Sequence, residues 1–276
     1  MDKIQEQIAS VWCVEQEILD VIHQLCIQNG LRYSLAYGTL LGAVRHGGFI
    51  PWDDDIDLMM PREDYNKLLE IWNQTAPEGY ILVNGDTSAD YTNNFSKIVK
   101  DHTTFLQCEE DRSKSFHKGI FVDIFPCDRT APGKLGQKLQ YYACAVNLLF
   151  SRGYTSGSGG IIGIIERILL RFPKRFHSVF WRASERYLTK WNTKVYTPYI
   201  FPCTIRECRK RYPADLFDNM GSILFNGKAY CSVSDTDKYL RFGYGDYMQL
   251  PPEEDRVWKH HPIIIDFEHN YEELNH

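Results

Sequence analysis

The sequence predicts an α/β or α+β fold in which a mixed sheet with flanking helices carries a helical insertion. Short runs rich in β-forming residues alternate with helical periodicity over about residues 30–130. After Pro132 the strand-like runs stop and helical patterns follow. Mixed structure returns near the C-terminus. The expected organisation is therefore a core with an N-terminal helix at 1–130, a helical subdomain at 131–205, and a closing segment at 206–276 that completes the core.

Two helices and six short strands are expected in the first half. Apolar residues at helical spacing predict a helix over about residues 3–28, and Asn29-Gly30 would end it. A second helix begins at Pro61, with Tyr65 and Trp72 on its apolar face. The expected strands span residues 31–37, 50–60, 80–83, 95–99, 104–108 and 120–125. The first of these strands leads into a turn at Gly38-Thr39, and Pro126 would end the last.

The second half is expected to begin with three helices and to end in mixed structure. The helices span about residues 134–151, 161–172 and 174–191. Residues 224–231 form a hairpin, because Asn226-Gly227 suits a type I′ turn. A short helix follows at 235–242.

The composition of the chain disfavours several classes of function. The net charge of −5, without a long block of one sign, disfavours nucleic-acid binding. The N-terminus lacks the apolar core of a secretory signal, and no apolar run is long enough to span a bilayer. Eight scattered cysteines without a CxxC pair indicate free thiols in a reducing compartment. A cytoplasmic location is therefore expected.

The most informative stretch, residues 38–58, joins a small-residue turn to a dense group of aspartates. Carboxylates repel one another and are costly to bury, so a crowded group of them indicates a bound cation. On a strand, Asp53, Asp55 and Asp57 would share one face because side chains alternate. Asp54 would point to the other side, where it could face solvent or pair with an arginine. Asp53 could instead cap a turn.

A further aspartate, Asp123, lies within an apolar strand. Such a carboxylate is costly unless it is paired, protonated or metal-bound. Together with Asp55 and Asp57 it forms a set of oxygen donors that suits Mg²⁺ or Mn²⁺. An EF-hand is excluded, because Leu58 stands where the loop needs glycine and Asp64 where it needs glutamate.

Five residues are candidates for contacts with phosphate. Gly38 and Thr39 offer close backbone approach and a hydroxyl, although the pair could be a plain turn. Arg45 and His46 lie in the glycine-rich connection, where they could bind phosphate or simply face solvent. Lys97 could bind phosphate or be an exposed strand lysine. The sequence contains no Walker A motif, no GxGxxG motif and no serine nucleophile elbow.

The segments that contain most of these residues resemble the LicD family of phosphotransferases, which includes bacterial phosphocholine transferases and is related to fukutin-related protein. Three segments carry the resemblance, at residues 38–58, 118–126 and 244–252. The last of these adds Tyr244 and Asp246, and the nearby His260 and His261, as possible pocket residues or as ordinary surface residues. No motif in the helical middle, 134–205, carries the resemblance.

The resemblance implies a nucleotidyltransferase-like fold and a metal-dependent reaction. Family members transfer a phospho-alcohol, most often phosphocholine, from a CDP-activated donor such as CDP-choline. The acceptor is a sugar hydroxyl of a surface glycan (teichoic acid, lipopolysaccharide or capsule) or of its lipid-linked precursor, and CMP leaves. Asp55 and Asp57 would hold Mg²⁺ or Mn²⁺, in a two-metal site that Asp123 completes. Asp123 could also help to deprotonate the acceptor. Fifteen residues separate Thr39 from Asp55, more than in simple nucleotidyltransferases.

Two other functions remain open from the sequence. The protein could be a nucleotidyltransferase that releases pyrophosphate, or a pseudoenzyme that binds a nucleotide or glycan without turnover. The segment 161–190 interleaves basic and apolar residues, so it could lie on an anionic membrane and hold the protein at the inner face of the membrane. It could equally be a packed helical subdomain with a solvated basic face.

Overall fold

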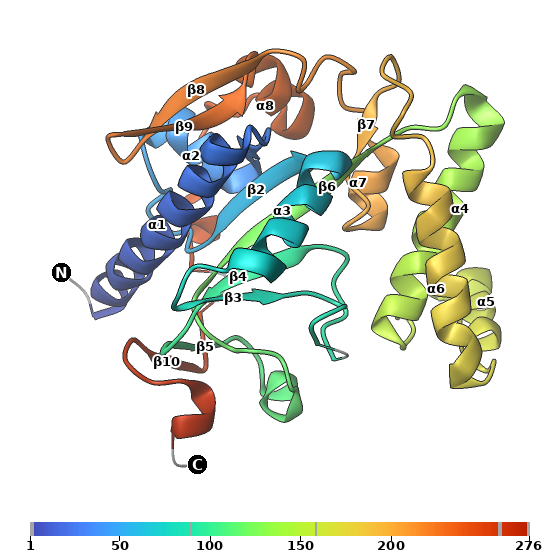
Figure 1. Cartoon of the computed structure of the whole chain (residues 1–276), viewed down its shortest axis with the longest axis horizontal. Helices are drawn as coiled ribbons and strands as arrows, with labels where there is room; N and C mark the ends of the chain where they lie inside the picture. Colours follow the sequence, from blue (N-terminus) through green and yellow to red (C-terminus); the bar gives the residue numbers. More distant parts are fainter. Residues whose placement is uncertain (1–2, 89, 158, 259–260, 275–276) are drawn as a thin grey trace. The chain divides into compact units, whose positions relative to one another are not determined.

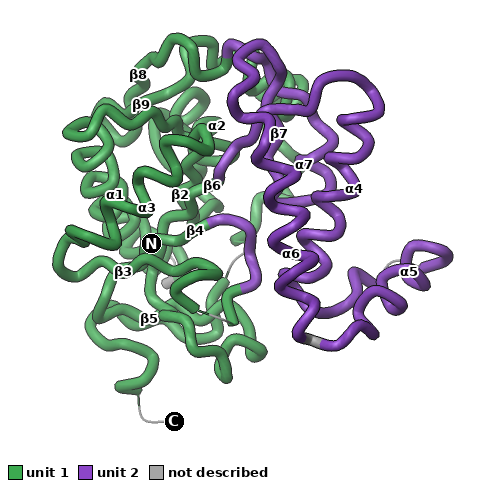
Figure 2. The backbone as a smooth tube through the Cα atoms, turned by 45° about the vertical axis from the view of Figure 1, so that its right-hand side comes forward, with its two compact units in different colours: residues 1–91, 96–125, 216–276 green, residues 92–95, 126–215 purple. Residues whose placement is uncertain are grey.

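The chain forms two compact units (Figure 2) in a computed structural model that describes residues 3–88, 90–157, 159–258 and 261–274. Unit 1 comprises Met1–Tyr91, Ser96–Phe125 and Leu216–His276, whereas unit 2 comprises Thr92–Phe95 and Pro126–Asp215. The chain therefore leaves unit 1 after Phe125, builds most of unit 2, and returns at Leu216. The expected mixed α/β class is confirmed.

The main sheet places β2 and β6 side by side at its centre, in the order β1-β2-β6-β4-β3 (Figure 1). The bounds are β1 (Ser34–Leu35), β2 (Ile56–Pro61), β3 (Tyr80–Val83), β4 (Ser96–Lys100) and β6 (Phe121–Arg129). Strand β1 pairs with β2, β3 with β4 and β4 with β6, all antiparallel. The β4–β6 register sets Lys97 opposite Asp123. Two neighbouring central strands therefore carry Asp57 and Asp123.

Three helices cover this sheet and form the core of unit 1: α1 (Lys3–Asn29), α2 (Tyr37–His46) and α3 (Arg62–Thr75). Helix α1 contacts β4, and α3 contacts β2 and β3. The apolar stripe of α1 is fully buried at Val11, Ile18 and Ile22, as its periodicity predicts. On α3, the predicted face with Tyr65 and Trp72 is also buried.

The C-terminal part of unit 1 adds a hairpin and smaller elements. These are β8 (Met220–Phe225), β9 (Lys228–Val233), α8 (Thr236–Tyr244), β10 (Ile264–Asp266) and the 3₁₀ turns Glu253–Asp255 and Tyr271–Glu273. Strand β10 pairs with β5 (Thr104–Leu106), which precedes a 3₁₀ turn at Glu109–Ser113. The hairpin turn has φ of 49° at Asn226 and 77° at Gly227, so the predicted type I′ turn is confirmed. The Asn226 N–H donates to the Gly47 carbonyl at 2.9 Å, which ties the hairpin to the loop after α2.

Two predicted strands begin or end elsewhere in the structure. The strand expected at 31–37 is reduced to β1, because α2 begins at Tyr37; Gly38 and Thr39 therefore lie in the first turn of a helix. The strand expected at 50–60 begins only at Ile56, because a turn closed by the bond from the Asp53 N–H to the Ile50 carbonyl precedes it.

The predicted end of β6 at Pro126 is wrong, because the strand continues to Arg129. Proline cannot donate a hydrogen bond in a sheet. Here β4 pairs with β6 only as far as Ile124, and β7 (Tyr199–Ile200) pairs with it only from Asp128. Pro126 lies between these two ladders, so neither β4 nor β7 requires its N–H.

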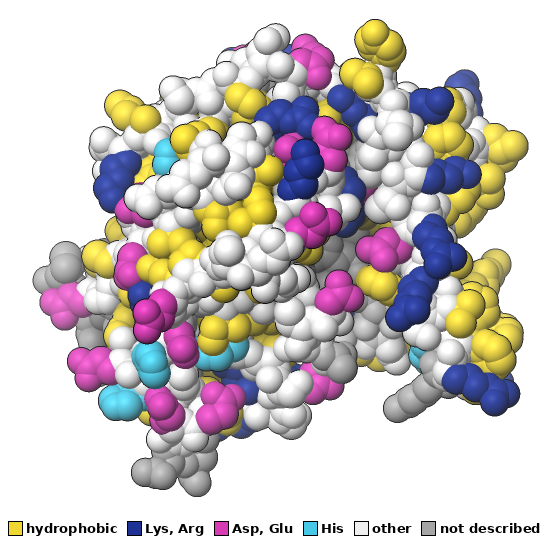
Figure 3. Space-filling view, viewed as in Figure 1, with side chains coloured by type: hydrophobic (Ala, Val, Ile, Leu, Met, Phe, Trp, Pro, Cys, Tyr) yellow, Lys and Arg dark blue, Asp and Glu magenta, His cyan; other side chains and the backbone are white. Residues whose placement is uncertain are grey.

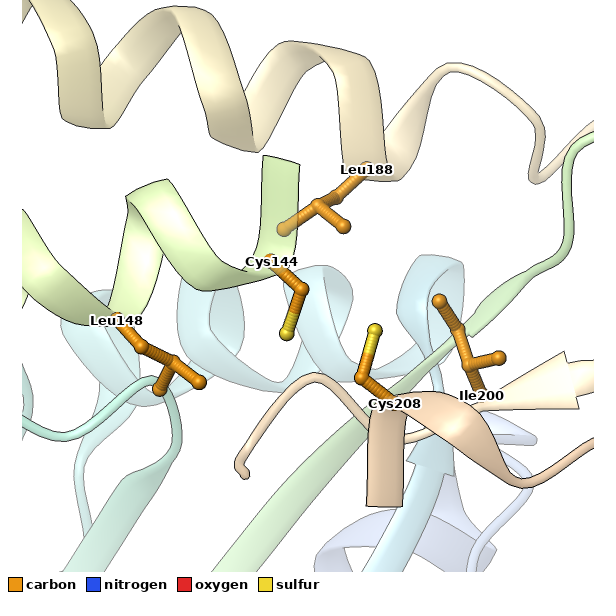
Figure 4. Packing of buried hydrophobic residues seen from close by; sticks show 5 residues of the cluster. All are labelled: Cys144, Leu148, Leu188, Ile200 and Cys208. Carbon is orange, nitrogen blue, oxygen red and sulfur yellow. The ribbon is translucent and has the colours of Figure 1, made fainter. Parts of the chain in front are cut away.

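Unit 2 contains the predicted helical middle. Its helices are α4 (Gly133–Arg152), α5 (Gly160–Leu170), α6 (Lys174–Thr189) and α7 (Ile205–Arg209). Helix α4 packs against α6 and α7 around a buried cluster of Cys144, Leu148, Leu188, Ile200 and Cys208 (Figure 4). A hydrogen bond with Cys208, together with burial, raises the pKa of the Cys144 thiol, so both cysteines act as small apolar side chains.

None of the helices in the described ranges combines the length and the apolar character needed to cross a lipid bilayer.

Candidate active site

The aspartate group lies where the chain enters the centre of the main sheet. Asp53, Asp54 and Asp55 lie in the loop before β2, and Asp57 is the second residue of the strand. The predicted alternation holds within β2, because Ile56 and Leu58 are fully buried. It also extends into the loop, because Asp54 is buried, at 3% exposed, whereas Asp53 and Asp55 are only half-buried. Asp54 therefore lies on the other side, as predicted, but the alternative that it faces solvent is wrong.

The charges of the other acidic side chains change the pKa of Asp57. Burial raises the pKa of Asp57 well above its ordinary value, and the charges of Asp55, Asp123 and Asp53 raise it further. The ammonium group of Lys97 acts in the opposite direction. The structure therefore brings the sequence-predicted aspartates and Lys97 into one electrostatic cluster.

Lys97 is largely buried within this cluster. Its Nζ atom lies 3.4 Å from Asp123 Oδ1 and 3.1 Å from the centre of the Phe121 ring. The Lys97 side chain is 14% exposed, so the alternative of an exposed strand lysine is wrong. Because β4 and β6 set Lys97 opposite Asp123, the sheet itself fixes this ion pair.

Glu15 of α1 is a member of the acidic cluster that the sequence reasoning missed. It is 2% exposed, and its Oε2 atom has no hydrogen-bond partner among the described residues. Burial, followed by the charges of Asp55, Asp54, Asp53 and Asp57, raises its pKa well above 4.5. A signal was present, because Glu15 falls four residues after Val11 and three before Ile18, inside the apolar stripe of α1.

Helix α1 also supports the loop that carries the aspartates. Trp12 Nε1 donates to the Asp53 carbonyl at 2.8 Å. The Trp12 ring stacks on Phe49, with 4.9 Å between ring centres. Trp12 and Glu15 are one helical turn apart, so they lie on the same face of α1. That face contacts the backbone of the loop before β2 and lies close to its aspartates.

Gly38 and Thr39 position the acidic residues from the first turn of α2. A Cβ atom at Gly38 would lie 2.5 Å from Asp53 Oδ2, so any other residue at position 38 would displace that carboxylate from its present place. The Thr39 hydroxyl accepts from the Asp57 N–H at 2.8 Å and donates to the Asp55 carbonyl at 3.4 Å. Thr39 is 3% exposed, so its hydroxyl holds the backbone between the two proposed ligands.

Replacing Thr39 by valine is expected to destabilise the protein by about 1–3 kcal/mol, because the buried Asp57 N–H loses its acceptor. Thr39→Ser keeps the hydroxyl and is expected to cost much less. Urea unfolding of the wild type and both variants measures the difference. If Thr39→Val and Thr39→Ser are equally stable, the Thr39 hydroxyl does not support β2.

Arg45 and His46 occupy the last turn of α2, not the glycine-rich loop in which the sequence placed them. Arg45 Nη1 donates to the Tyr247 carbonyl at 2.9 Å and to the Gln249 carbonyl at 3.5 Å, so it binds the third family segment to α2. Burial lowers the pKa of Arg45, and burial together with Arg45 lowers that of His46. The His46 ring lies edge-on to Trp52 at 6.1 Å.

The structure describes three of the remaining C-terminal candidates, which are Tyr244, Asp246 and His261. Tyr244 is the last residue of α8, and its electrostatic effect raises the pKa of Arg45, against the lowering by burial. Asp246 is exposed. His261 packs beside Trp258 at 4.8 Å. His260 lies outside the described residues.

The donor chemistry of the cluster fits a hard divalent cation. Asp55, Asp57 and Asp123 offer carboxylate oxygens, and a cation would relieve the repulsion that raises the pKa of Asp57. In the described part of the chain, no three His, Cys, Asp or Glu side chains converge closely enough to hold one ion. Joint ligation by the three aspartates therefore requires their side chains to rearrange.

Comparison with known proteins gives one match over most of the chain and several shorter ones. Residues 30–139 match the family described as LicD/FKTN/FKRP, nucleotidyltransferase domain. The chain is 30% identical over 263 residues to the lipopolysaccharide cholinephosphotransferase LicD of Haemophilus influenzae, which covers 88% of this chain and 92% of that protein. It is 60% identical over 35 residues to human ribitol 5-phosphate transferase FKRP, 13% of this chain and 7% of that protein. The uncharacterized protein RP689 of Rickettsia prowazekii is 42% identical over 66 residues, 24% of this chain and 25% of that protein.

Proposed function

This chain belongs to the LicD family and is a LicD-type phosphotransferase, and we propose that it transfers a phospho-alcohol from a CDP-activated donor to a sugar hydroxyl. The acceptor is a cell-surface glycan or its lipid-linked precursor, and CMP is released. We expect phosphocholine to be the transferred group, because the Haemophilus influenzae relative is a lipopolysaccharide cholinephosphotransferase. The name of FKRP makes ribitol phosphate the second group to test.

The observation that carries this proposal is the largely buried acidic cluster at two adjacent central strands, β2 and β6. Phosphoryl transfer depends mainly on positioning and on neutralising the charge of the phosphates. Asp55, Asp57 and Asp123 would hold one or two Mg²⁺ or Mn²⁺ ions, which when bound supply that neutralisation. We assign to Asp123 the further role of accepting the proton of the acceptor hydroxyl, with Lys97 holding its carboxylate in place.

The donor would be held by basic side chains and by the start of α2. Lys97, Arg45 and His46 supply positive charge or hydrogen-bond donors suited to a diphosphate. Gly38 and Thr39 offer backbone N–H groups at the start of α2, a favourable place for an anion. Asp53, whose carboxylate lies against Gly38, would contact the donor or the cation at the same point.

Release of CMP from a panel of CDP-alcohols tests the proposal. CDP-choline, CDP-ribitol, CDP-glycerol and CDP-ethanolamine are each incubated with the protein, a glycan acceptor, and Mg²⁺ or Mn²⁺. We expect CMP to appear with one donor above the others, and EDTA to abolish its release. Pyrophosphate release from a nucleoside triphosphate would indicate a nucleotidyltransferase instead. Donor binding in a calorimeter without any CMP would indicate a pseudoenzyme.

We also propose that the transfer takes place in the cytoplasm. All eight cysteines are free thiols, which suits a reducing compartment.

A further inference from the structure

Helix α5 of unit 2 exposes an apolar stripe. Ile161, Ile165, Ile168 and Phe172 recur at helical spacing and are 76%, 51%, 54% and 45% exposed. Ile162 and Ile164 extend this surface with 61% and 49% exposure. Scattered exposed apolar residues are ordinary, but a contiguous patch on one short helix indicates a binding surface.

The contact between α5 and the rest of unit 2 uses the other side of the helix. Gly163 is the one buried residue of α5. Glu166 pairs with Arg152 at 3.6 Å and accepts from the Ser156 hydroxyl at 2.9 Å. The inward side therefore carries a glycine and a paired acid, whereas the isoleucines point outward. Figure 2 shows α5 projecting from the rest of unit 2.

Positive charge flanks this apolar stripe. Residues 161–190 contain seven Lys or Arg and two Glu, a net charge of +5 in a chain whose total is −5. Arg171, Arg175, Arg182 and Arg186 are exposed, and no ion pair links them to an acid among the described residues. Figure 3 shows hydrophobic side chains gathered over α5 with Lys and Arg side chains beside them.

We propose that this surface, formed by the exposed isoleucines of α5, Phe172 and the exposed arginines of α5–α6, docks on an anionic phospholipid bilayer. Helices that lie in the membrane interface insert an apolar face between the headgroups while basic residues bind anionic lipid. The apolar stripe and the arginines occur together on one segment. This favours a lipid surface over a protein partner, whose docking face would need matching acidic groups at fixed positions. The proposal does not depend on which alcohol or sugar the enzyme uses.

Vesicle flotation of the full chain tests this proposal. The vesicles contain either phosphatidylcholine alone or equal parts of phosphatidylcholine and phosphatidylglycerol. We expect the protein to float with the anionic vesicles, to float poorly with the neutral ones, and to dissociate as the salt concentration rises, because salt screens charge.

A matched pair of variants separates this surface from general effects. Ile165→Ser/Arg171→Glu removes one exposed isoleucine and reverses one charge within the surface. Ile27→Ser/Lys67→Glu makes the same changes at exposed positions of unit 1. The first variant is expected to bind anionic vesicles at least about tenfold more weakly, since each basic residue contributes roughly fivefold at such a membrane. The control should bind like the wild type, and both should release CMP in solution at the wild-type rate.

Three results would overturn the proposal. One is a wild-type protein that does not float with anionic vesicles, and another is a surface variant that floats as well as the control. The third is a wild-type dimer in light scattering that becomes a monomer in the surface variant without any vesicle binding, because α5 would then be an interface between two copies. Circular dichroism confirms that both variants are folded.

Discussion

Replacing Asp57 by asparagine is expected to lower metal-dependent CMP release by about 10³-fold or more. A cation at a phosphoryl-transfer site contributes several kcal/mol to the transition state, and each 1.36 kcal/mol is a factor of ten in rate. Asparagine keeps the shape of the side chain but removes the charge that would bind the cation. Asp57 is also the residue on which the charges of Asp55, Asp123 and Asp53 act.

The same substitution is expected to leave the fold intact and to raise the thermal midpoint in EDTA. The half-buried Asp57 carboxylate is repelled by its neighbours, and an amide would not be. Rates of CMP release and melting curves, with and without Mn²⁺, measure both effects. Asp86→Asn, at an exposed position of unit 1, is the matched control and should change neither. Normal turnover by the Asp57→Asn variant would refute the proposed metal role.

Replacing Glu15 by glutamine is expected to stabilise the protein in metal-free buffer, increasingly so as the pH rises. The native pKa of Glu15 lies above its ordinary value of 4.5 because of burial and of the four neighbouring aspartates. Between these two pKa values the native state binds more protons than the unfolded state, so the free energy of unfolding falls as the pH rises. Each pKa unit between the native and the unfolded value lowers the free energy of unfolding by about 1.4 kcal/mol once the pH exceeds both values. Glutamine removes this loss.

Urea unfolding between pH 4 and pH 8 in EDTA measures the difference between the wild type and the Glu15→Gln variant. The two should be equally stable near about pH 4, with the variant more stable at about pH 8. Glu17→Gln, two residues along α1, is the control with the opposite sign, because hydrogen bonds from Lys100 and Tyr80 lower the pKa of Glu17. A Glu15→Gln variant that is less stable than the wild type at high pH would show that the ionised Glu15 has a stabilising partner.

Local sequence patterns predicted the elements with strong periodicity. Helices α1 and α3, the three long helices of unit 2 and the Asn226-Gly227 hairpin all follow from spacing or turn chemistry. Tertiary contacts decided the elements where local preference is weak. Only two residues of the β-forming run 31–37 form a strand, β1, because helix α2 begins at Tyr37.

The sequence predicted the aspartates of the acidic cluster but not every residue that belongs to it. Asp55, Asp57 and Asp123 could be identified because aspartates within apolar sequence are costly to bury. Alternation placed Asp54 on the correct side, with Ile56, but the alternative that it faces solvent was wrong because that side is buried. Glu15 was passed over, although a carboxylate inside an apolar stripe carries the same cost. Which distant helix faces the loop depends on the fold, and no local pattern contains that information.

The role of Thr39 could likewise not be read from the sequence. A hydroxyl in a glycine-containing turn suggests a phosphate contact, whereas the structure directs it to the backbone at Asp55 and Asp57. The partners of Arg45 are also backbone carbonyls, about two hundred residues away in sequence. Such long-range hydrogen bonds leave no trace in spacing or periodicity.

The return of the chain to unit 1 at Leu216 constrains the order of events while the protein is being synthesised. Domains generally fold as units as the chain emerges, the N-terminal parts first. The acidic residues emerge early, but the partner of Arg45 at Tyr247 and the hairpin bonded to Gly47 emerge only after all of unit 2. A ribosome that stops within the last quarter of the message would therefore release a chain with every proposed catalytic aspartate and an incompletely assembled sheet unit.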